Sequence, residues 1–206
     1  MPPIYHFTHG SNLRPVLGAG AIRAHALAGD ETVTDIAEPG IKAKRAIKAV
    51  PCDPGSCVGN YVPFYFAPRS PMLYSISRDN VTGVDPDQAP IVYLVSSTER
   101  VTGSGLPFAF SDGNAATAIT EFSNDIGVLA AMVDWPLMEE TYWRNTLEDG
   151  DRVRRRMAEF LVLDALPLSL VEEVAVFDVR IEARVREILH EAGVDVPVAV
   201  RRDWYF

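Results

Sequence analysis

The chain has 206 residues, of which 48% are hydrophobic and 23% are charged, and this is the composition of a globular protein. No apolar run reaches the roughly 20 residues that cross a bilayer, and the N-terminus lacks the basic and apolar regions of a signal peptide. The formal net charge of −9 argues against a protein that coats nucleic acid without sequence preference, since that function needs clustered lysine and arginine. We therefore predict a cytoplasmic protein that has no membrane partner and forms a single domain over residues 1–206.

The first 60 residues alternate between short apolar runs and helical segments. Ser11 has the side chain of a helix N-cap, and the helix after it is expected to end at Gly18 or Gly20. A later helix should end before Pro51, because the residue that precedes a proline disfavours helical geometry. The expected elements are a strand, a helix, a strand, a helix and a loop rich in proline and glycine, at residues 4–9, 12–20, 21–25, 36–48 and 51–60.

The middle of the chain carries its most aromatic stretch, YVPFYF (61–66) and MLYSIS (72–77) around APRSP. Proline fixes φ and removes a backbone donor, so we interpret residues 61–74 as a stiff, hairpin-like segment. The β-branched run IVYLVSS (91–97) predicts a buried strand. Residues 108–114 predict a strand that ends in a turn.

The remaining residues predict helices, then strands, then a last helix and strand. Residues 115–145 are expected to be helical with a break near Trp135 and Pro136. The run IEARVREILHEA (181–192) has the spacing of an amphipathic helix. A short helical stretch and three strands are expected at residues 152–158, 159–164, 172–178 and 196–204. Many short strands that carry a few helices predict an α+β fold with mixed or antiparallel sheets.

The first predicted strand presents a polar pair on one face. Because side chains alternate across a strand, His6 and Thr8 share a face and His9 points the other way, which argues against a metal site made by the two histidines. The pair can bind a ribose hydroxyl or an amide, or it can be a hydrogen-bonded part of a half-buried strand. The residues alone leave both interpretations open.

The aromatic stretch is suited to line a pocket. Rigid aromatic side chains fit a planar ligand such as a nucleobase or a nicotinamide ring. Core packing is the simpler explanation for Val62, Phe64 and Phe66. For Tyr65, Arg69, Met72 and Tyr74, the sequence favours neither ligand contact nor core packing over the other.

Glu159 stands at the head of the apolar run EFLVLD. On a strand it shares a face with Leu161 and Leu163, and a buried carboxylate is costly unless a cation or a ligand hydroxyl stabilises it. The nearest charges along the chain are the arginines of DRVRRRM (151–157). Glu159 can be a general base or bind a hydroxyl, or it can be an edge residue that faces water.

Several sequence signatures are absent, and their absence argues against P-loop, Rossmann, serine hydrolase and zinc protease functions. The chain has no GxxxxGK[ST], no GxGxxG after a strand, no GxSxG and no HExxH. Cys52 and Cys57 lack the further ligands of a zinc site, so we expect two reduced thiols, with a local disulfide as the alternative. Basic clusters at 41–48, 151–157 and 200–206 are either solvated surfaces or parts of a local basic groove.

Five segments, IYHFTH (4–9), VPFYFAPRSPMLY (62–74), SDGNAA (111–116), AEFLV (158–162) and RRDWYF (201–206), follow one another from one end of the chain to the other. In sequence and order they resemble the DarT-type DNA ADP-ribosyltransferase toxins. The resemblance implies an ADP-ribosyltransferase fold of the α+β class, in which two mixed or antiparallel sheets with peripheral helices surround an NAD cleft.

The activity that the resemblance implies is transfer of ADP-ribose from NAD+ to N3 of a thymine in single-stranded DNA, with release of nicotinamide. No metal is implied. The partners would be thymine-containing single-stranded DNA and a DarG-type macrodomain antitoxin. Glu159 would be catalytic together with Arg45, the only arginine of the helix before the proline- and glycine-rich loop.

The resemblance also implies two further sets of residues. The cofactor-binding residues would be His6, Thr8, Asn12, Arg45, Tyr65, Met72 and Tyr74. The DNA-binding residues would be Arg69, Arg154 and Arg155. Residues 112–156 are the least similar part, so the DNA sequence preference is the least defined. Two alternatives stay open: the same fold acting on guanine, an RNA phosphate or a protein, or a single-strand binder without catalysis.

Overall fold

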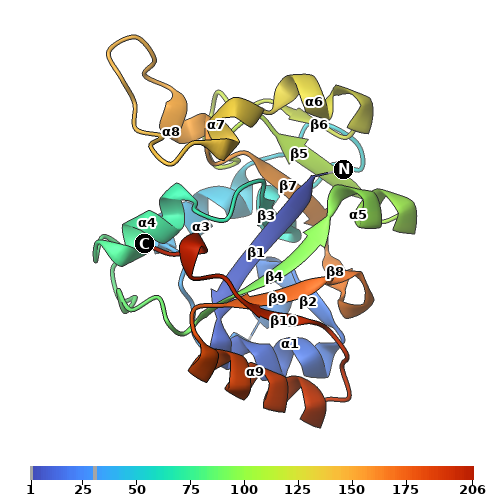
Figure 1. The fold of residues 1–206 in the computed structure, drawn as a ribbon. Helices are drawn as coiled ribbons and strands as arrows, with labels where there is room; N and C mark the ends of the chain where they lie inside the picture. The colour runs from blue at the N-terminus through green and yellow to red at the C-terminus, as the bar shows by residue number, and fades with distance from the viewer. Residues whose placement is uncertain (1, 30–31) are drawn as a thin grey trace.

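A computed structural model describes residues 2–29 and 32–206, and an eight-stranded sheet lies at its centre (Figure 1). The strands follow the order β10-β9-β4-β1-β3-β7-β5-β6, and β9 and β10 are the parallel pair of an otherwise antiparallel sheet. A second sheet pairs β2 with β8. The strands are β1 Pro3–His9, β2 Ala21–Arg23, β3 Tyr61–Tyr65, β4 Ile91–Ser97, β5 Phe108–Ser111, β6 Phe122–Ser123, β7 Glu159–Leu163, β8 Ala165–Pro167, β9 Glu173–Val176 and β10 Val198–Val200.

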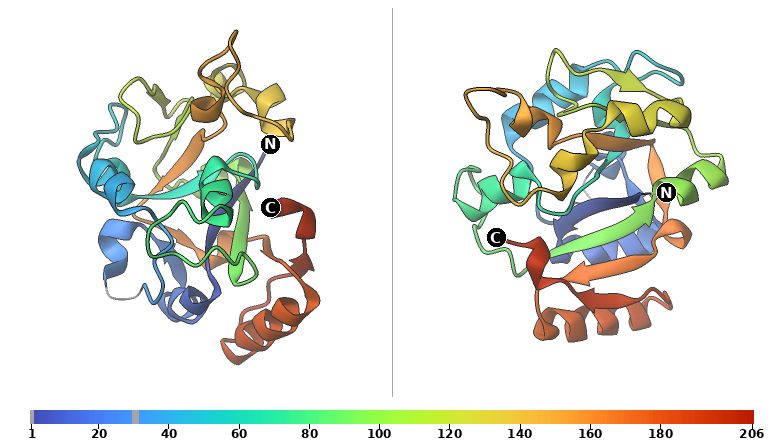
Figure 2. Two further views of the ribbon diagram at one scale, coloured as in Figure 1. Left: turned by 90° about the vertical axis from the view of Figure 1, so that its left-hand side faces the viewer. Right: turned by 45° about the horizontal axis from the view of Figure 1, so that its top comes forward.

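Helices α1 and α9 lie toward one end of the molecule, and α6, α7 and α8 lie toward the other (Figures 1 and 2). The α-helices are α1 Leu13–Ala19, α2 His25–Ala28, α3 Pro39–Ile47, α4 Pro71–Ser77, α5 Thr98–Ser104, α6 Leu129–Met132, α7 Trp135–Glu139, α8 Arg152–Arg155 and α9 Val179–Glu191. The 3-10 helices are η1 Gly10–Asn12, η3 Val58–Asn60, η4 Ile126–Val128, η5 Leu168–Leu170 and η6 Arg202–Trp204. None of the described helices is long and apolar enough to cross a membrane.

The large sheet is joined weakly at its middle. Strands β1 and β4 pair along seven residues, whereas β1 and β3 share the single register pair Tyr5↔Tyr65. Pro63 has no N–H to continue the ladder, and its carbonyl accepts a hydrogen bond from the ring of His6. The α+β fold is confirmed. The two large sheets that were expected are the two halves of one eight-stranded sheet, and a single register pair between β1 and β3 joins these halves.

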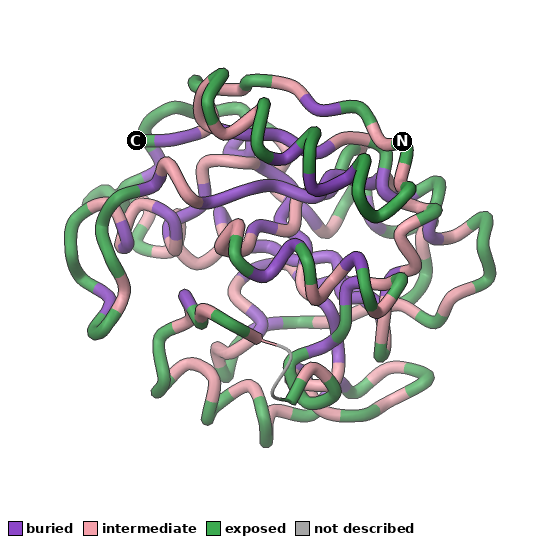
Figure 3. The backbone as a smooth tube through the Cα atoms, turned by 90° about the horizontal axis from the view of Figure 1, so that it is seen from below, coloured by how far each residue is buried: buried purple, intermediate pink, exposed green. Residues whose placement is uncertain are grey.

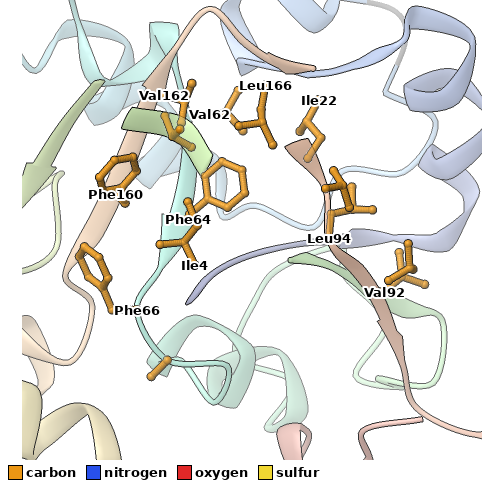
Figure 4. Close-up of a cluster of buried hydrophobic side chains, with 14 of the residues drawn as sticks. Ile4, Ile22, Val62, Phe64, Phe66, Val92, Leu94, Phe160, Val162 and Leu166 are labelled. Atoms are coloured by element: carbon orange, nitrogen blue, oxygen red, sulfur yellow. The ribbon is translucent and has the colours of Figure 1, made fainter. Parts of the chain in front are cut away.

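The core lies along both halves of this sheet. Ile4, Phe64, Leu94 and Phe160 come from four different strands and are at most 1% exposed (Figure 4). Burying each side chain of this size stabilises the fold by roughly 1.5–3 kcal/mol. Exposed residues are concentrated on the surrounding helices and loops (Figure 3). The rigid core therefore holds the strand ends that carry the polar residues of the site.

The prediction of a hairpin-like segment over residues 61–74 is wrong in its second half. Residues 61–65 form β3, but residues 71–77 form helix α4. Ser70 caps this helix, since its Oγ accepts a hydrogen bond from Leu73 N–H at 3.2 Å, and Pro71 fills the first helical position. A serine followed by proline is a helix-start signal, and the aromatic composition concealed it.

The prediction of a largely helical 115–145 segment is also wrong. The segment contains β6, η4 and the short helices α6 and α7, joined by irregular backbone. Asp112 accepts from Glu121 N–H and Asn114 accepts from Ala116 N–H, each at 2.9 Å. Asparagine and aspartate side chains that bond the local backbone favour turns over helix.

Several element boundaries differ from the predicted ones, and two of them have a clear local cause. The first helix begins at Leu13, and Ser11 lies inside η1, where its hydroxyl donates to Thr34 instead of capping a helix. The last strand ends at Val200 and η6 follows it, because the parallel pairing with β9 covers three residues only.

Candidate active site

A cavity of about 720 Å³ lies beside the point where β1 and β3 separate. Its volume falls within the range of about 300–1,000 Å³ that is typical of small-molecule and cofactor sites. Strands β1 to β3, helices α2 to α4 and residues 32–38 contribute to its wall. The predicted site residues that line it are His6, Thr8, Asn12, Arg45, Tyr65 and Met72.

His6 and Thr8 present an acceptor and a donor to the cavity. His6 Nδ1 lies 2.9 Å from the Pro63 carbonyl oxygen, and because a carbonyl only accepts, we assign the ring proton to Nδ1 and leave Nε2 as an acceptor. Burial lowers the pKa of His6 and favours the neutral ring. Thr8 Oγ1 accepts from Asn12 Nδ2 at 2.9 Å, so its own hydrogen is available to a ligand.

Asn12 fixes one wall of the cavity. Its Oδ1 accepts from the N–H groups of Val33 and Thr34 at 2.8 and 2.9 Å, and its Nδ2 donates to the Thr34 carbonyl at 2.8 Å as well as to Thr8. These four bonds use the full capacity of an amide. Asn12 lines the cavity, but its polar atoms position Thr8 and residues 33–34 instead of reaching toward a ligand.

Glu159 and Arg45 form an ion pair beside the cavity: Arg45 is part of the cavity wall, whereas Glu159 is not and reaches the wall through its partner. Arg45 Nη1 donates to both carboxylate oxygens, at 3.0 and 2.9 Å, and Ala115 N–H donates to Oε1 at 3.1 Å. The Glu159 side chain is 1% exposed and that of Arg45 is 16% exposed. The pairing explains how an apolar strand tolerates this carboxylate, because the cation and an amide N–H satisfy it.

The arginines upstream of Glu159 in the chain are therefore not its partners. The partner, Arg45, comes from α3. The pairing of β7 with β3 places Glu159 beside Tyr65. Arg45 Nη2 is buried and has no hydrogen-bond partner among the described residues. An unmade hydrogen bond of a buried group costs about 1–3 kcal/mol, so a ligand oxygen at this nitrogen would be stabilised.

Tyr65 forms an aromatic wall next to this pair. Its ring stacks on Phe7 with 5.8 Å between centroids, and its hydroxyl donates to the Met72 sulfur at 3.6 Å. Burial and then the nearby charge of Glu159 raise the pKa of Tyr65, so the phenol stays protonated. A flat ring of a ligand can pack against this surface.

Arg154 anchors the loop that delivers the Ala115 N–H to Glu159. Its guanidinium donates to both oxygens of Asp112, each at 2.9 Å, and also to Asp151. The Arg154 carbonyl accepts from Asn114 N–H at 3.0 Å. Gly113 passes so close that a Cβ there would lie 2.4 Å from Arg154 Nη1 and 2.9 Å from the Arg154 carbonyl oxygen. The loop thus depends on Arg154 and on a glycine.

The other predicted residues lie away from the cavity wall. Tyr74 faces the opposite side of α4 from Met72, and its ring contacts Trp143 and Phe206. The Arg69 guanidinium lies 4.3 Å from the centre of the Phe206 ring. Arg155 pairs with Asp134 and Asp149. DNA binding by Arg69, Arg154 and Arg155 stays a prediction. The ion pairs of Arg154 and Arg155 show that these two residues also have a structural role.

The cavity wall at the Glu159 end includes residues that were not predicted, namely Asn114, Val153 and Met157. The SDGNAA motif signalled Asn114, but no sequence feature marks the other two, since only the meeting of α8 with the sheet places them there. Among the described residues no group of three histidine, cysteine, aspartate or glutamate side chains could hold a metal ion. Cys52 and Cys57 are free cysteines.

Comparison with known proteins shows the family to which the chain is similar. The family described as DarT, ssDNA thymidine ADP-ribosyltransferase, matches residues 5–206. A DNA ADP-ribosyl transferase of Thermus aquaticus is 40% identical over 206 residues, which cover 98% of this chain and 88% of the relative. A fusion protein of Thermosipho africanus, a DNA ADP-ribosyl transferase joined to a DNA ADP-ribosyl glycohydrolase, is 26% identical over 197 residues, which cover 94% of this chain and 47% of the fusion.

Solved structures of Thermus sp. 2.9 DarT superimpose closely on the chain. The complex with ADP-ribosylated ssDNA has a TM-score of 0.93 at 37% identity, with 100% of this chain and 96% of that chain covered. The complex with NAD+ has a TM-score of 0.88 at 36% identity, with 100% and 98% covered.

Proposed function

The chain belongs to the DarT family of single-stranded DNA ADP-ribosyltransferases, and from this premise we propose that it transfers ADP-ribose from NAD+ to N3 of a thymine base, releasing nicotinamide. The observation that carries the proposal is the ion pair of the buried Glu159 with Arg45, which lines a cofactor-sized cavity. A carboxylate and a guanidinium in a water-poor site are what a reaction through a cationic sugar requires.

We assign NAD+ to the cavity with its nicotinamide ribose toward Glu159. Nicotinamide is planar and matches the aromatic wall of Tyr65 and Phe7. The acceptor of His6 and the donor of Thr8 suit a carboxamide or a ribose hydroxyl, which both donate and accept. Arg45 Nη2, which lacks a partner among the described residues, suits a diphosphate or ribose oxygen.

The reaction breaks the bond between ribose C1 and the nicotinamide nitrogen and forms a bond from the same carbon to thymine N3. Nicotinamide leaves with the electron pair of the broken bond. As nicotinamide departs, positive charge develops on the ribose. The Glu159 carboxylate stabilises this charge by holding the ribose 2′-hydroxyl. It then accepts the proton that N3 loses, because neutral N3–H is a poor nucleophile.

Arg45 holds both oxygens of Glu159 in the structure. Glu159 is 1% exposed and is not part of the cavity wall, so the proposal requires Arg45 to shift before a hydroxyl or an N3–H group can reach the carboxylate. A guanidinium stays protonated, so the freed donor is suited to bind the anion that develops on thymine N3 and O4, and not to act as a base. Base pairing hides N3 in a duplex, which accounts for a single-stranded substrate.

The biological role in the proposal is that of a cytoplasmic toxin countered by a DarG-type macrodomain antitoxin. The support is the family membership together with the Thermosipho africanus relative, in which a DNA ADP-ribosyl glycohydrolase is fused to the transferase. A hydrolase that reverses the modification is the expected counterpart of an enzyme that makes it.

Mass spectrometry tests the proposal after NAD+ is incubated with single-stranded oligonucleotides of mixed sequence, with fragmentation to locate the adduct. We expect a gain of one ADP-ribose on thymine and no product on strands without thymine. An adduct on guanine, or an equal yield on a strand of adenine only, would refute the choice of base. Parallel reactions with RNA and with protein test the other acceptors. No nicotinamide release with any acceptor would identify a binder without catalysis.

A further inference from the structure

A cluster of aromatic and arginine side chains, which we call the Tyr74 surface, lies outside the cavity. It consists of Arg69, Tyr74, Arg78, Trp143, Arg144 and Phe206. The Tyr74 ring meets Phe206 and Trp143 edge to face, with centroids 5.1 and 5.7 Å apart. The C-terminus lies beside α4, and the segment after α7 extends from the same side (Figure 1). Three segments far apart in the sequence thus converge.

The arginines of this surface lack acidic partners. Among the described residues, no carboxylate lies within ion-pair distance of Arg69, Arg78 or Arg144. The chain has 28 acidic and 19 basic residues, so acidic side chains are in excess. Arg78 and Arg144 are exposed, the Arg78 guanidinium lies 5.1 Å from the centre of the Tyr74 ring, and the two arginines lower the pKa of Tyr74. The surface is a local concentration of positive charge on an acidic protein.

The Tyr74 surface is connected to the Glu159 end of the cavity. Helix α4 turns Met72 and Ser75 to the cavity while Tyr74 faces outward. Arg152 donates to the carbonyls of Tyr142 and Arg144 at 3.1 and 3.0 Å. Val153, which lines the cavity, donates its N–H to Asn145 Oδ1 at 2.9 Å. The segment that carries Trp143 and Arg144 is therefore tied to the wall against which an acceptor base would lie.

We propose that the Tyr74 surface binds the single-stranded DNA next to the modified nucleotide. Its arginines contact phosphates, and the half-buried Tyr74 and the exposed Phe206 offer ring faces or edges to neighbouring bases. Aromatic rings with arginines are typical of sites that hold single strands with little sequence preference. The inference rests on the proposed function, because it assumes a DNA strand whose target base lies at Glu159.

The test compares a substrate of about four nucleotides with strands of about twelve, extended on the 5′ or the 3′ side of the same thymine. The test variant is R78A/R144A, and the control is R184A, which removes an exposed arginine of α9. For wild type we expect a KM at least about tenfold lower on one of the extended strands than on the short one. We expect R78A/R144A to lose most of this gain while kcat stays within about twofold on every strand. R184A should keep the full gain.

Binding of labelled strands by fluorescence anisotropy separates this inference from the proposed function, since it needs no turnover. Each lost phosphate contact should reduce the salt dependence of affinity by about 0.7 in log–log slope. Equal behaviour of R78A/R144A and wild type on all lengths overturns the inference, as does a wild-type enzyme indifferent to length. If DNA binding is unchanged but inhibition by a macrodomain partner is lost, the surface binds protein and the inference is wrong.

Discussion

The two ends of the cavity are built by different means. Where β1 and β3 separate, His6 and Thr8 are neutral, and a backbone carbonyl and the Asn12 amide hold them. At the other end, Glu159 depends on the charged side chain of Arg45 and on a loop that Arg154 anchors. The first end therefore offers fixed hydrogen bonds to a cofactor, and the second offers charge that can be rearranged during the reaction.

The strongest test of the charged end is removal of the carboxylate. We expect Glu159→Ala to reduce kcat by at least about 10³-fold, or about 4 kcal/mol of barrier, because the proposal assigns to this one carboxylate both the hold on the 2′-hydroxyl and the removal of the proton. Nicotinamide release in the presence of a thymine-containing strand measures it. Glu159→Gln is the matched variant, since it keeps the size and the Ala115 contact but loses the charge, and it should be equally inactive. Full activity of either variant with an unchanged melting temperature would contradict the assignment.

Arg45→Ala should affect activity and stability together. We expect turnover to fall at least about tenfold, or about 1.4 kcal/mol, and the free energy of unfolding to fall by about 3–5 kcal/mol, since Glu159 is left buried and unpaired. Denaturant unfolding of Arg45→Ala and of the double variant Arg45→Ala/Glu159→Ala measures the second effect. The double variant should be the more stable of the two. If it is not, the pair does not stabilise the carboxylate as described.

Gly113→Ala probes the loop without touching either charge of the pair. The new methyl group would lie within contact distance of Arg154, so the loop must shift and weaken the Ala115 bond to Glu159. We expect kcat to fall about fivefold, because small displacements near the reacting atoms are costly. Gly103→Ala is the control, since its Cβ meets no atom within 4 Å, and it should keep full activity.

The smallest effect is expected at the neutral end and depends on pH. Burial lowers the pKa of His6 in the folded protein, so the unfolded chain binds its proton first as the pH falls. Stability contributed by neutral His6 is complete above the unfolded pKa of about 6.5 and is lost as the pH falls toward the folded pKa. The difference in unfolding free energy between wild type and His6→Gln should shrink or reverse over this range. An unchanged difference from pH 7.5 to pH 5 would show that folding does not lower the pKa of His6, and it would contradict this prediction.

Strands were easier to predict from the sequence than the segments between them. The run IVYLVSS predicted β4 because β-branched residues on a fully buried strand form a continuous apolar signal. Residues 115–145 gave a false helix, and at the start of this segment the side chains of Asn114 and Asp112 accept hydrogen bonds from the N–H groups of Ala116 and Glu121, which leaves no periodic pattern in the sequence. The α4 helix was missed although Ser70 and Pro71 marked its start.

The sequence by itself determined that a carboxylate sits at the head of a buried strand, that His6 and Thr8 share one face, and, through resemblance, which family the chain belongs to. These are properties of local order and of strand periodicity. Only the tertiary structure decided that Arg45, 114 residues away, pairs with Glu159, that Tyr74 turns away from the cavity, and that Arg154 anchors a loop. These contacts depend on which strands are neighbours in the sheet and on which face a helix turns toward the cavity. The spacing of residues along the chain determines neither of them.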